Sequence, residues 1–376
     1  MLVFGTRPEA IKMAPLIKVL QKDQHFITKV AVTAQHREML DQVLELFEIT
    51  PDYDLNIMKS GQTLIGITTR VLEGLSEILV EEQPDMVLVH GDTSTTFVSS
   101  LAAFYNKIAI GHVEAGLRTF DKTQPFPEEI NRRLTGTMAD LHFSPTPRAK
   151  GNLLAEGIKP ENVYVTGNTV IDALLPMVKK DYVFTDPLLN RLDSTKPLLL
   201  GEAHRRENLG KPLEDIFNAL LEIVDTHPEV QLVYSVHPNP QVKETAKKML
   251  DGKERIYLID PPAYKEWVNL MARATLLLTD SGGLQEEAPA VGVPVLVLRD
   301  VTERPEGLRT GTLKLVGTDK EKIVSLAHRL LTDKEAYLKM AKAPNPYGDG
   351  KACERIRDAL LNYYFDLERP RDYIVN

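Results

Sequence analysis

Cysteine is almost absent from this sequence: its 376 residues include one, Cys353. A single cysteine excludes an intrachain disulfide and any metal site built from several cysteines, and it suits a cytoplasmic protein. Long apolar runs are missing too. No stretch approaches the roughly 18 apolar residues of a membrane-spanning helix, and the N-terminus does not read as a signal peptide. We therefore expect a cytoplasmic protein with no membrane partner, in which Cys353 is structural.

Excess positive charge is also lacking. The chain carries 45 Lys and Arg residues against 53 Asp and Glu residues, a formal net charge of -8. This balance argues against a nucleic-acid partner and against broad binding to anionic membranes. It leaves room for a local basic pocket.

Several chemical signatures are absent as well. The chain has neither Gly-x-Gly-x-x-Gly nor Gly-x-x-x-x-Gly-Lys-Ser/Thr, which argues against a P-loop NTPase and gives no mark of a dinucleotide cofactor. It has no His-x-x-x-His pair, no aspartate triad with metal spacing and no Gly-x-Ser-x-Gly nucleophile elbow. We therefore expect no metal site.

What the sequence does contain is a repeated alternation of short apolar runs with amphipathic stretches. The apolar runs expected to form strands lie at 30–33, 86–90, 108–112, 141–144, 197–200, 231–236, 256–259, 275–278 and 293–298, and residues 1–4 read as the end of a further buried strand. Amphipathic stretches such as 64–82, 213–226 and 321–331 fall between them. The pattern predicts an α/β fold with parallel sheets covered by helices on both faces. Because the chain is too long for one typical core, we expect two such domains.

The expected linker is 172–196, where periodicity is weak and no strong strand is seen. It separates an N-terminal domain, 1–171, from a C-terminal domain, 197–351. A last amphipathic helix is expected at about 352–366, followed by a mobile charged tail. Two doubly wound domains facing each other would bind a ligand in the cleft between them, at the carboxyl ends of their strands.

The segment 279–288, TDSGGLQEEA, stands where an apolar strand passes into a helix. Such a junction exposes backbone N–H groups and the positive end of a helix dipole, which suits a phosphate. Gly282 and Gly283 let a ligand approach the backbone beside Ser281. Glu287, one helical turn further on, is placed to accept hydrogen bonds from sugar hydroxyls. The pattern indicates a nucleotide-diphosphate site, and an ordinary strand–loop–helix junction is the alternative.

Carboxylates follow two expected strands of the first domain. Asp92 comes after 86–90, where it either meets a sugar hydroxyl or caps the next helix. Glu114 comes after 108–112, where burial can raise the pKa of a carboxyl and make it an acid or a base. An ion pair between Glu114 and Arg118 is the alternative.

Two further pairs carry charge near strand ends of the first domain. Glu128 and Arg132 stand at i and i+4 of an expected helix, a spacing typical of surface salt bridges. The dense string PEEINR around them favours a site instead. Arg7 and Lys12 lie at a strand–helix turn with a proline near the helix start, where cations suit a diphosphate or the carboxylates. A solvated helix face is the alternative for this second pair.

Basic residues follow the expected strands of the second domain. His204, next to Arg205, is placed to donate to a leaving phosphate, although a basic loop without chemistry is the alternative. Arg304 either reaches a phosphate or orders its own loop, and the role of His237 is open. Carboxylates therefore dominate the first domain and phosphate-binding groups the second. This division predicts chemistry on a sugar held by the first domain, with a nucleotide anchored by the second.

Together these segments resemble the bacterial non-hydrolysing UDP-N-acetylglucosamine 2-epimerases. The resemblance covers nearly the whole chain, and this order of motifs is highly specific. The matching strings are FGTRPEAIKMAP (4–15), TAQHR (33–37), HGDT (90–93), GHVEAGLR (111–118), PEEINR (127–132), GNT (167–169), AHRREN (203–208), TDSGG (279–283) and TERPE (302–306).

The resemblance implies a fold similar to the GT-B glycosyltransferases, with two Rossmann-like domains and the active site between them, as a homodimer. It also implies that the C-terminal helix, 352–366, packs back on the first domain. It implies interconversion of UDP-N-acetylglucosamine and UDP-N-acetylmannosamine without metal or other cofactor, supplying N-acetylmannosamine for cell-surface polysaccharide. It also implies a route: UDP leaves carbon 1, a proton leaves carbon 2, and both are added back to the resulting 2-acetamidoglucal.

By matching position, the resemblance also implies roles for single residues. The acid/base candidates are Asp92, Glu114 and Glu128, oriented by Arg132. The UDP side comprises Arg7, Lys12, Pro262, Trp267, Ser281, Gly282, Gly283, Glu287 and Arg304, together with His204 as a catalytic residue. An allosteric UDP-N-acetylglucosamine would fall on Gln35, Glu38, Gly61, Glu128, Arg205 and His237.

The chain departs from the family pattern at a few positions. Gly61 and Glu38 stand where some relatives carry Arg and Gln, so the strength of allosteric activation is open. Gly201 and Glu202 replace the apolar residue and threonine usual before AHRR, and Pro262 replaces a polar residue of some members.

Three other functions remain open on the sequence. A hydrolysing relative would release free N-acetylmannosamine and UDP. A glycosyltransferase of the same fold would need an acceptor. A nucleotide-sugar sensor would bind without catalysis.

Overall fold

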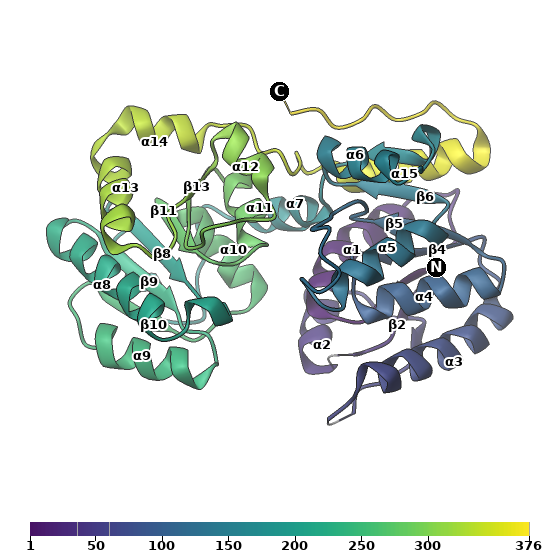
Figure 1. The fold of residues 1–376 in the computed structure, drawn as a ribbon, viewed down its shortest axis with the longest axis horizontal. Helices are drawn as coiled ribbons and strands as arrows, with labels where there is room; N and C mark the ends of the chain where they lie inside the picture. Colours follow the sequence, from purple (N-terminus) through teal and green to yellow (C-terminus); the bar gives the residue numbers. More distant parts are fainter. Residues whose placement is uncertain (36, 60, 376) are drawn as a thin grey trace. The chain divides into compact units, whose positions relative to one another are not determined.

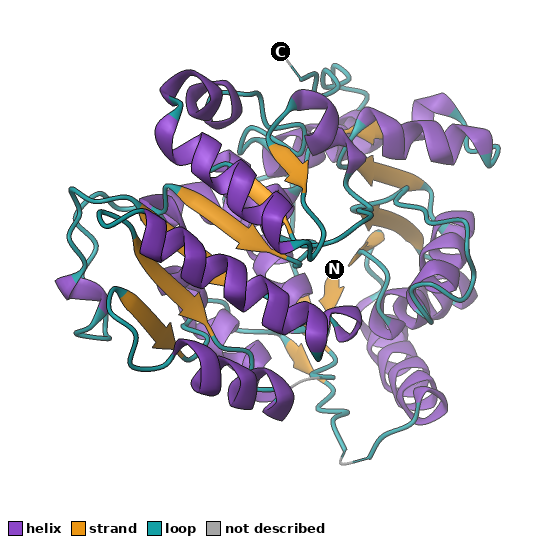
Figure 2. Cartoon of the chain, turned by 60° about the vertical axis from the view of Figure 1, so that its left-hand side comes forward, coloured by secondary structure: helices purple, strands orange, loops and turns teal. Residues whose placement is uncertain are grey.

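Parallel β-sheets form the framework of the computed structural model, which describes residues 1–35, 37–59 and 61–375 (Figure 1). The described chain divides into two compact units, one of residues 1–173 with 347–375 and the other of residues 174–346. In each unit helices lie on both faces of the sheet (Figure 2). Each unit therefore has the doubly wound, Rossmann-like architecture expected from the alternating pattern.

The first unit is built on a seven-stranded sheet of order β3-β2-β1-β4-β5-β6-β7. Its elements are β1 (Leu2–Phe4), α1 (Arg7–Gln21), β2 (Val30–Val32), α2 (Arg37–Leu46), β3 (Tyr53–Asp54), α3 (Leu64–Glu82), β4 (Met86–His90), α4 (Ser94–Tyr105), β5 (Ala109–Val113), α5 (Glu128–Met138), β6 (Leu141–Ser144), α6 (Pro147–Ala155), η1 (Pro160–Asn162), β7 (Val163–Val165), α7 (Thr169–Leu174, whose last residue counts with the second unit) and α15 (Ala352–Phe365). The strand order reverses between β1 and β4, where Leu2 pairs with Leu88. The loops after these two strands therefore meet at the point where open α/β sheets bind ligands.

The second unit repeats this plan with a six-stranded sheet of order β10-β9-β8-β11-β12-β13. Its elements are η2 (Leu175–Met177), η3 (Leu189–Arg191), β8 (Leu198–Glu202), η4 (Arg206–Asn208), α8 (Lys211–Thr226), β9 (Gln231–Ser235), α9 (Pro240–Leu250), β10 (Ile256–Ile259), α10 (Tyr264–Arg273), β11 (Leu276–Thr279), α11 (Leu284–Ala290), β12 (Val295–Val297), α12 (Pro305–Thr310), β13 (Leu313–Leu315), α13 (Lys320–Thr332) and α14 (Lys334–Ala341). The order reverses between β8 and β11. A buried cluster that includes Phe217 and Tyr234, with rings edge-on at 5.0 Å, packs α8 against this sheet.

The predicted strands all appear, with ends that differ from the prediction by no more than two residues. The sequence did not predict β3, β7 and β13. These three are edge strands of two or three residues, too short to carry a periodic signal.

The expected linker does not stand apart from the second unit. Lys179 N donates to Asn269 Oδ1 at 2.8 Å, and Phe184 and Leu189 are buried. The residues that make these contacts are spaced irregularly along 174–196. Because they follow neither a helical nor a strand period, the contacts could not be predicted from the sequence.

The expected mobile tail was also wrong for the described residues up to 375. Asp372 pairs with Lys150 at 2.6 Å and accepts a hydrogen bond from Val165 N at 2.9 Å, and Tyr373 is buried. The tail thus packs on the first unit, beside the edge strand β7.

The start of α15 is held by a buried carboxylate of the same unit. Asp172 accepts hydrogen bonds from Ala352 N at 3.1 Å and Cys353 N at 2.8 Å. It satisfies two N–H groups that the helix itself leaves unpaired, and so ties the C-terminal helix to α7. No helix among the residues described is long and apolar enough to cross a membrane.

Candidate functional site

Glu114 follows β5 directly and has a left-handed backbone conformation, with φ of 62°. Residues other than glycine rarely adopt this conformation, which costs on the order of 1–3 kcal/mol. Its carboxylate, 9% exposed, forms an ion pair with Lys12 and accepts a hydrogen bond from Asn168 Nδ2 at 2.7 Å. The side chain is therefore held firmly at the end of the sheet.

The residues around Glu114 exclude the ion pair with Arg118 that the sequence left open. Arg118 pairs with Glu156, at 2.8 and 2.7 Å, so the alternative Glu114–Arg118 ion pair is wrong. His90 Nε2 lies 3.8 Å from the Glu114 carboxylate. Burial lowers the pKa of His90 to about 4, so its imidazole stays neutral near pH 7.

Asp92 lies in the loop after β4 and forms a salt bridge with Arg132 at 2.8 Å. Asn131 Nδ2 donates to the Asp92 carbonyl at 3.0 Å. Burial raises the pKa of the Asp92 carboxyl, an effect that Arg132 opposes and Glu114 reinforces. Thr93, rather than Asp92, caps α4 by accepting a hydrogen bond from Thr96 N. The capping role that the sequence left open for Asp92 is therefore excluded.

Glu128 and Glu129 open α5 and face different surroundings. Glu129 is buried, accepts hydrogen bonds from the backbone of Thr119 and Phe120, and lies 3.7 Å from Arg132. Glu128 Oε2 is buried with no hydrogen-bond partner within the described part of the chain. Arg132 thus forms salt bridges with Asp92 and Glu129. The i, i+4 salt bridge between Glu128 and Arg132 that the spacing allowed is not formed in the described chain.

Glu9 is a buried residue that the sequence reasoning missed. Its carboxylate accepts hydrogen bonds from Thr6 N at 2.8 Å and from the hydroxyls of Thr93 at 2.8 Å and Thr96 at 3.1 Å. It therefore ties the loop after β1, which leads to Arg7, to the loop after β4. The Thr-x-x-Glu spacing of a capping box was the available signal.

Asp280 organises the equivalent place in the second unit. It directly follows β11, is fully buried, and accepts hydrogen bonds from His204 N, Arg205 N at 2.9 Å and Asn208 Nδ2 at 2.8 Å. A buried carboxylate with several such donors is fully paired. The loop after β8 is thereby fixed against the loop after β11.

His204 lies in the loop that Asp280 holds. Its ring stacks on His237 at 5.0 Å, and its Nδ1 lies 3.3 Å from Glu202 Oε1. The Glu202 carboxylate raises the pKa of His204, while burial opposes that effect. Burial and the neighbouring His204 lower the pKa of His237.

The turn at Ser281 passes from β11 into α11, as the sequence predicted. Ser281 N donates to Thr279 Oγ1 at 3.0 Å, and Gln285 Nε2 donates to Ser281 O at 3.0 Å. A Cβ at Gly282 would lie 3.0 Å from Glu303 Oε1, so the Glu303 side chain in the loop after β12 would have to shift slightly. The turn is therefore compact and close to that loop.

Arg304 stands in the loop after β12 and is paired with two carboxylates. Its Nε donates to Glu286 Oε1 at 2.8 Å, and its guanidinium lies 2.9 Å from Glu303. Although burial opposes the effect, Arg304 and Arg299 lower the pKa of Glu303 to about 2. Arg304 therefore orders its loop and keeps its charge near the Ser281 turn.

The remaining predicted residues are distributed over both units. Trp267, on α10, and Glu287, on α11, are buried, and Pro262 follows β10. Gln35, Glu38 and Gly61 lie in the first unit, and Arg205 and His237 in the second; His36 of the TAQHR string lies outside the described residues. Thr95 Oγ1 lies 3.2 Å from Gln35 Oε1.

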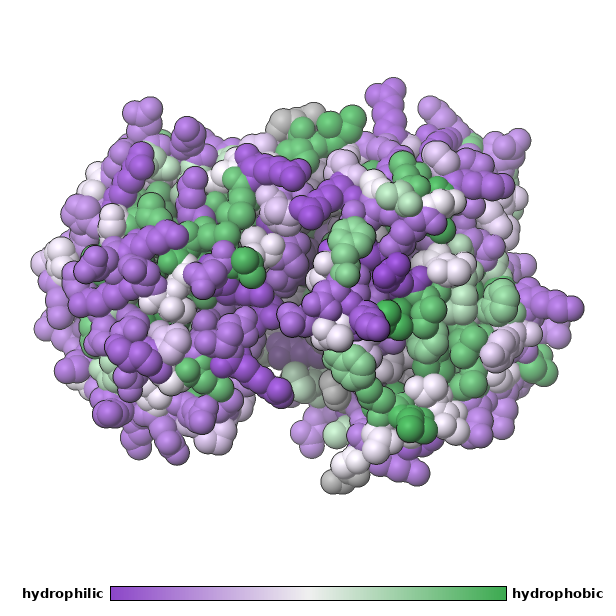
Figure 3. All heavy atoms as spheres, viewed as in Figure 1, coloured by the Kyte–Doolittle hydropathy of each residue, from purple (hydrophilic) through white to green (hydrophobic). Residues whose placement is uncertain are grey.

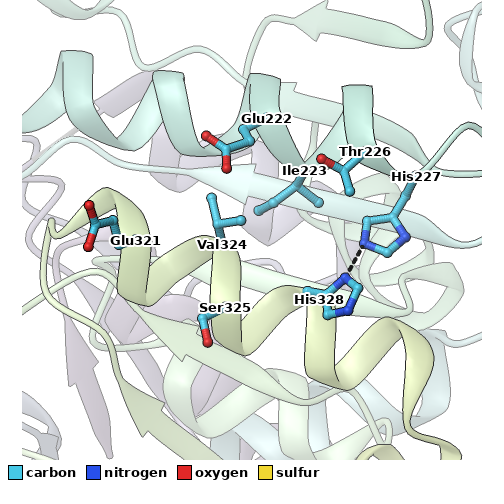
Figure 4. Close-up of a pocket in the computed structure, with 8 residues that line it drawn as sticks. All are labelled: Glu222, Ile223, Thr226, His227, Glu321, Val324, Ser325 and His328. Carbon is cyan, nitrogen blue, oxygen red and sulfur yellow. Dashed lines mark hydrogen bonds between the residues drawn. The ribbon is translucent and has the colours of Figure 1, made fainter.

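A separate pocket of about 310 Å³ lies between α8 and α13 (Figure 4). His227 Nε2 and His328 Nδ1 are 3.1 Å apart at its wall, and His227 Nδ1 lies 3.4 Å from Glu229. The residues that line it include none of the predicted site residues. Across the described chain, no three His, Cys, Asp or Glu side chains gather so as to hold a metal ion.

The chain is similar to known proteins both in sequence and in structure. The family model described as UDP-N-acetylglucosamine 2-epimerase matches residues 18–361. UDP-N-acetylglucosamine 2-epimerase of Bacillus subtilis (strain 168) is 56% identical, over 99% of this chain and 98% of that protein. The Escherichia coli (strain K12) enzyme is also 56% identical, over 97% and 99%.

Solved structures agree. The crystal structure of UDP-GlcNAc 2-epimerase from Neisseria meningitidis bound to UDP-GlcNAc has 49% identity, covers 96% of this chain and 99% of its own, and gives a TM-score of 0.87. The predicted GT-B-like class, with two Rossmann-like domains, is confirmed, and so is the predicted family. The chain belongs to the UDP-N-acetylglucosamine 2-epimerase family.

Proposed function

We propose that this protein is a non-hydrolysing isomerase that interconverts UDP-N-acetylglucosamine and UDP-N-acetylmannosamine at sugar carbon 2. Family membership supports it, as do the relatives that carry this name and the Neisseria meningitidis structure with UDP-GlcNAc bound. The observation that carries the proposal is Glu114. A carboxylate fixed at a strand end by Lys12 and Asn168, on a strained backbone, is a feature typical of catalytic positions.

The chemistry explains why the site needs charged groups of both signs. The hydrogen on carbon 2 is not next to a carbonyl, so direct removal of the proton would give an unstabilised carbanion. When the bond between carbon 1 and the UDP oxygen breaks, its electron pair leaves with UDP and carbon 1 becomes cationic. A base then takes the carbon 2 proton, and the C–H electron pair forms the double bond of a 2-acetamidoglucal. Returning a proton to the opposite face, and UDP to carbon 1, gives the epimer.

We assign the proton transfers to the carboxylates at the strand ends of the first unit. Asp92, Glu114 and Glu128 are the acid/base candidates, and Arg132 orients Asp92 through their 2.8 Å salt bridge. The raised pKa of Asp92 suits a group that must hold a proton for part of the cycle. Arg7 and Lys12 add positive charge at the same end of the sheet, where the sugar diphosphate begins.

We assign the binding of UDP to residues of the second unit. The compact turn at Ser281, Gly282 and Gly283 offers backbone N–H groups to the diphosphate, and His204 and Arg304 offer charge. Glu287 would accept from the ribose hydroxyls, and Trp267 would stack beside the uracil next to Pro262. Positioned donors stabilise the negative charge that develops on UDP as it leaves.

The test is incubation of the protein with UDP-N-acetylglucosamine in heavy water, followed by NMR of the products. We expect UDP-N-acetylmannosamine with deuterium at carbon 2. An epimer that keeps its original hydrogen contradicts the elimination route. Free N-acetylmannosamine with UDP as main products would mean a hydrolysing enzyme. No exchange at all would mean a sensor, or a glycosyltransferase that lacks its acceptor.

We further propose a cytoplasmic homodimer that supplies N-acetylmannosamine for cell-surface polysaccharide. Exposed hydrophobic residues gather over α3 and α4 (Figure 3), and they include Leu64, Ile65, Val80, Phe104 and Tyr105. Exposed apolar residues gathered in this way suit contact with a second copy of the chain. Light scattering of the purified protein measures the mass; a monomer would contradict the dimer.

We also propose activation by a second UDP-N-acetylglucosamine, at Gln35, Glu38, Gly61, Glu128, Arg205 and His237. Gln35 is held beside Thr95, which fixes one of the side chains that would meet this ligand. Activation predicts that turnover of pure UDP-N-acetylmannosamine rises when a trace of UDP-N-acetylglucosamine is added. A rate that does not respond would exclude it.

A further inference from the structure

Glu202 is the last residue of β8 and lies beside the candidate catalytic His204. Its Oε1 is 3.3 Å from His204 Nδ1, and its side chain is 21% exposed. That nitrogen is itself buried and makes no hydrogen bond of acceptable angle within the described chain, so its contact with Glu202 is a close charge pair. Because Nδ1 cannot reach bulk water, the charge state of the imidazole depends on the groups around it.

The other charged and titratable groups around His204 are Asp280, Arg205 and His237. Asp280 Oδ1 lies 3.5 Å from the same Nδ1, but its oxygens already accept from the backbone of His204 and Arg205 and from Asn208. Among the residues the structure describes, Glu202 makes no other salt bridge and no competing side-chain hydrogen bond. Glu202 is thus the carboxylate that is available to pair with Nδ1.

The end of β8 is held firmly enough to keep Glu202 in this place. The Tyr234 ring packs over Gly201, where an added Cβ would lie 2.7 Å from Tyr234 Cδ2. Tyr234 Oη accepts a hydrogen bond from Ala203 N at 3.0 Å. The residues on each side of Glu202 are therefore fixed by one buried side chain.

We propose that Glu202 is a positioning residue that directs His204 Nδ1–H toward its own carboxylate, leaves Nε2–H to donate to the departing diphosphate, and keeps the imidazole charged. This inference rests on the proposed function for its catalytic consequence. In a neutral imidazole only one nitrogen carries the proton, whereas the charged ring donates from both. An imidazolium beside the diphosphate stabilises the charge that UDP gains as the carbon 1–oxygen bond breaks. The direction in which Glu202 shifts the pKa of His204 agrees with this role.

The experiment compares the wild type with Glu202→Gln, which keeps the size of the side chain and removes its charge. The turnover number kcat is measured from pH 6 to 9.5 at saturating UDP-N-acetylglucosamine. Without the carboxylate His204 loses its proton at lower pH, so the alkaline limb of kcat should move to lower pH. We expect kcat about threefold to tenfold lower at pH 8.5 and equal to wild type at pH 6.

A second readout does not depend on activity. The His204 ring resonance, in protein labelled with ¹³C-histidine and assigned with His204→Asn, should titrate at lower pH in Glu202→Gln. Glu202→Asp keeps the charge and should restore part of the difference. A His204 titration that is identical in wild type and Glu202→Gln would overturn the inference, and so would a kcat lowered equally at every pH.

The matched control is Glu229→Gln. Glu229 Oε1 lies 3.4 Å from Nδ1 of His227, which lines the pocket between α8 and α13 (Figure 4). This variant removes a carboxylate at nearly the same distance from a histidine, and the kcat profile should not move. A wild type that epimerises nothing would contradict the proposed function, yet the NMR titration would still test the pairing of Glu202 with His204.

Discussion

Asp92 and Asp280 occupy matching places in the two units, yet their surroundings differ. Each follows the strand that lies beside the reversal of strand order, β4 in one sheet and β11 in the other. The Asp92 side chain is 28% exposed and faces the guanidinium of Arg132. The Asp280 side chain has no exposed surface, and donors from three residues saturate it.

This difference separates two uses of a carboxylate. A carboxylate saturated by backbone donors cannot exchange a proton without breaking the loop it holds, so Asp280 shapes the site. A carboxylate with a partly exposed side chain and a single paired cation can gain or lose a proton at modest cost. We therefore expect acid/base chemistry at this topological position in the first unit and loop architecture in the second.

The largest expected effect is on turnover, from Asp92→Asn. We expect kcat to fall by about 10²–10⁴-fold, because the substitution removes a proposed proton-transfer group. The melting temperature should change little, since Arg132 keeps its contact with Glu129. Steady-state kinetics and thermal unfolding measure the two quantities, with Asp225→Asn, exposed on α8, as the control. A large loss of melting temperature would mean that Asp92, like Asp280, mainly holds its loop in place, and it would contradict the difference between the two carboxylates.

The converse pattern is expected from Asp280→Asn. The amide keeps one acceptor oxygen but turns N–H groups toward the backbone N–H groups of His204 and Arg205. We expect the free energy of unfolding to fall by about 2–3 kcal/mol, and the affinity for UDP to fall with the loss of loop order. Urea denaturation and calorimetric titration with UDP check this. A variant as stable as wild type but inactive would contradict the structural role.

A smaller effect is expected from Glu303→Gln, and it depends on pH. The pKa of Glu303 is about 2 in the folded protein, against an ordinary value of 4.5. A carboxyl with a lowered pKa stabilises the fold fully above its unfolded value, and the contribution disappears as pH falls toward the folded value. We expect Gln to cost about 1–2 kcal/mol above pH 4.5, because water screens part of the pairing with Arg304 and Arg299. Melting temperatures between pH 3 and 7 should converge at the acid end; a constant difference would exclude this account.

The sequence predicted well what depends on order along the chain. Strand ends carry the polar residues in a parallel sheet, so the strings around Asp92, Glu114, His204 and Ser281 could be placed at one edge of each sheet. The α1 start at Arg7 and the turn into α11 followed from proline and glycine chemistry.

Partners across the sheet could not be predicted in this way. Glu9 meets Thr93 because β1 and β4 are neighbours, although 84 positions separate the two residues. The role of Asp280 likewise depends on the adjacency of β8 and β11. Glu128 and Glu129 are adjacent in sequence, and only the packing of α5 decides which of them is buried against the backbone of the preceding loop.

The left-handed backbone at Glu114 has a consequence for how this protein can be stabilised. Asparagine and glycine adopt that conformation more readily than glutamate, so either should raise the melting temperature at this position unless the lost contacts with Lys12 and Asn168 outweigh the relief. Substitutions chosen for heat resistance from backbone preference alone would therefore replace the proposed acid/base residue Glu114. Stability and the proposed acid/base role would then compete at a single position.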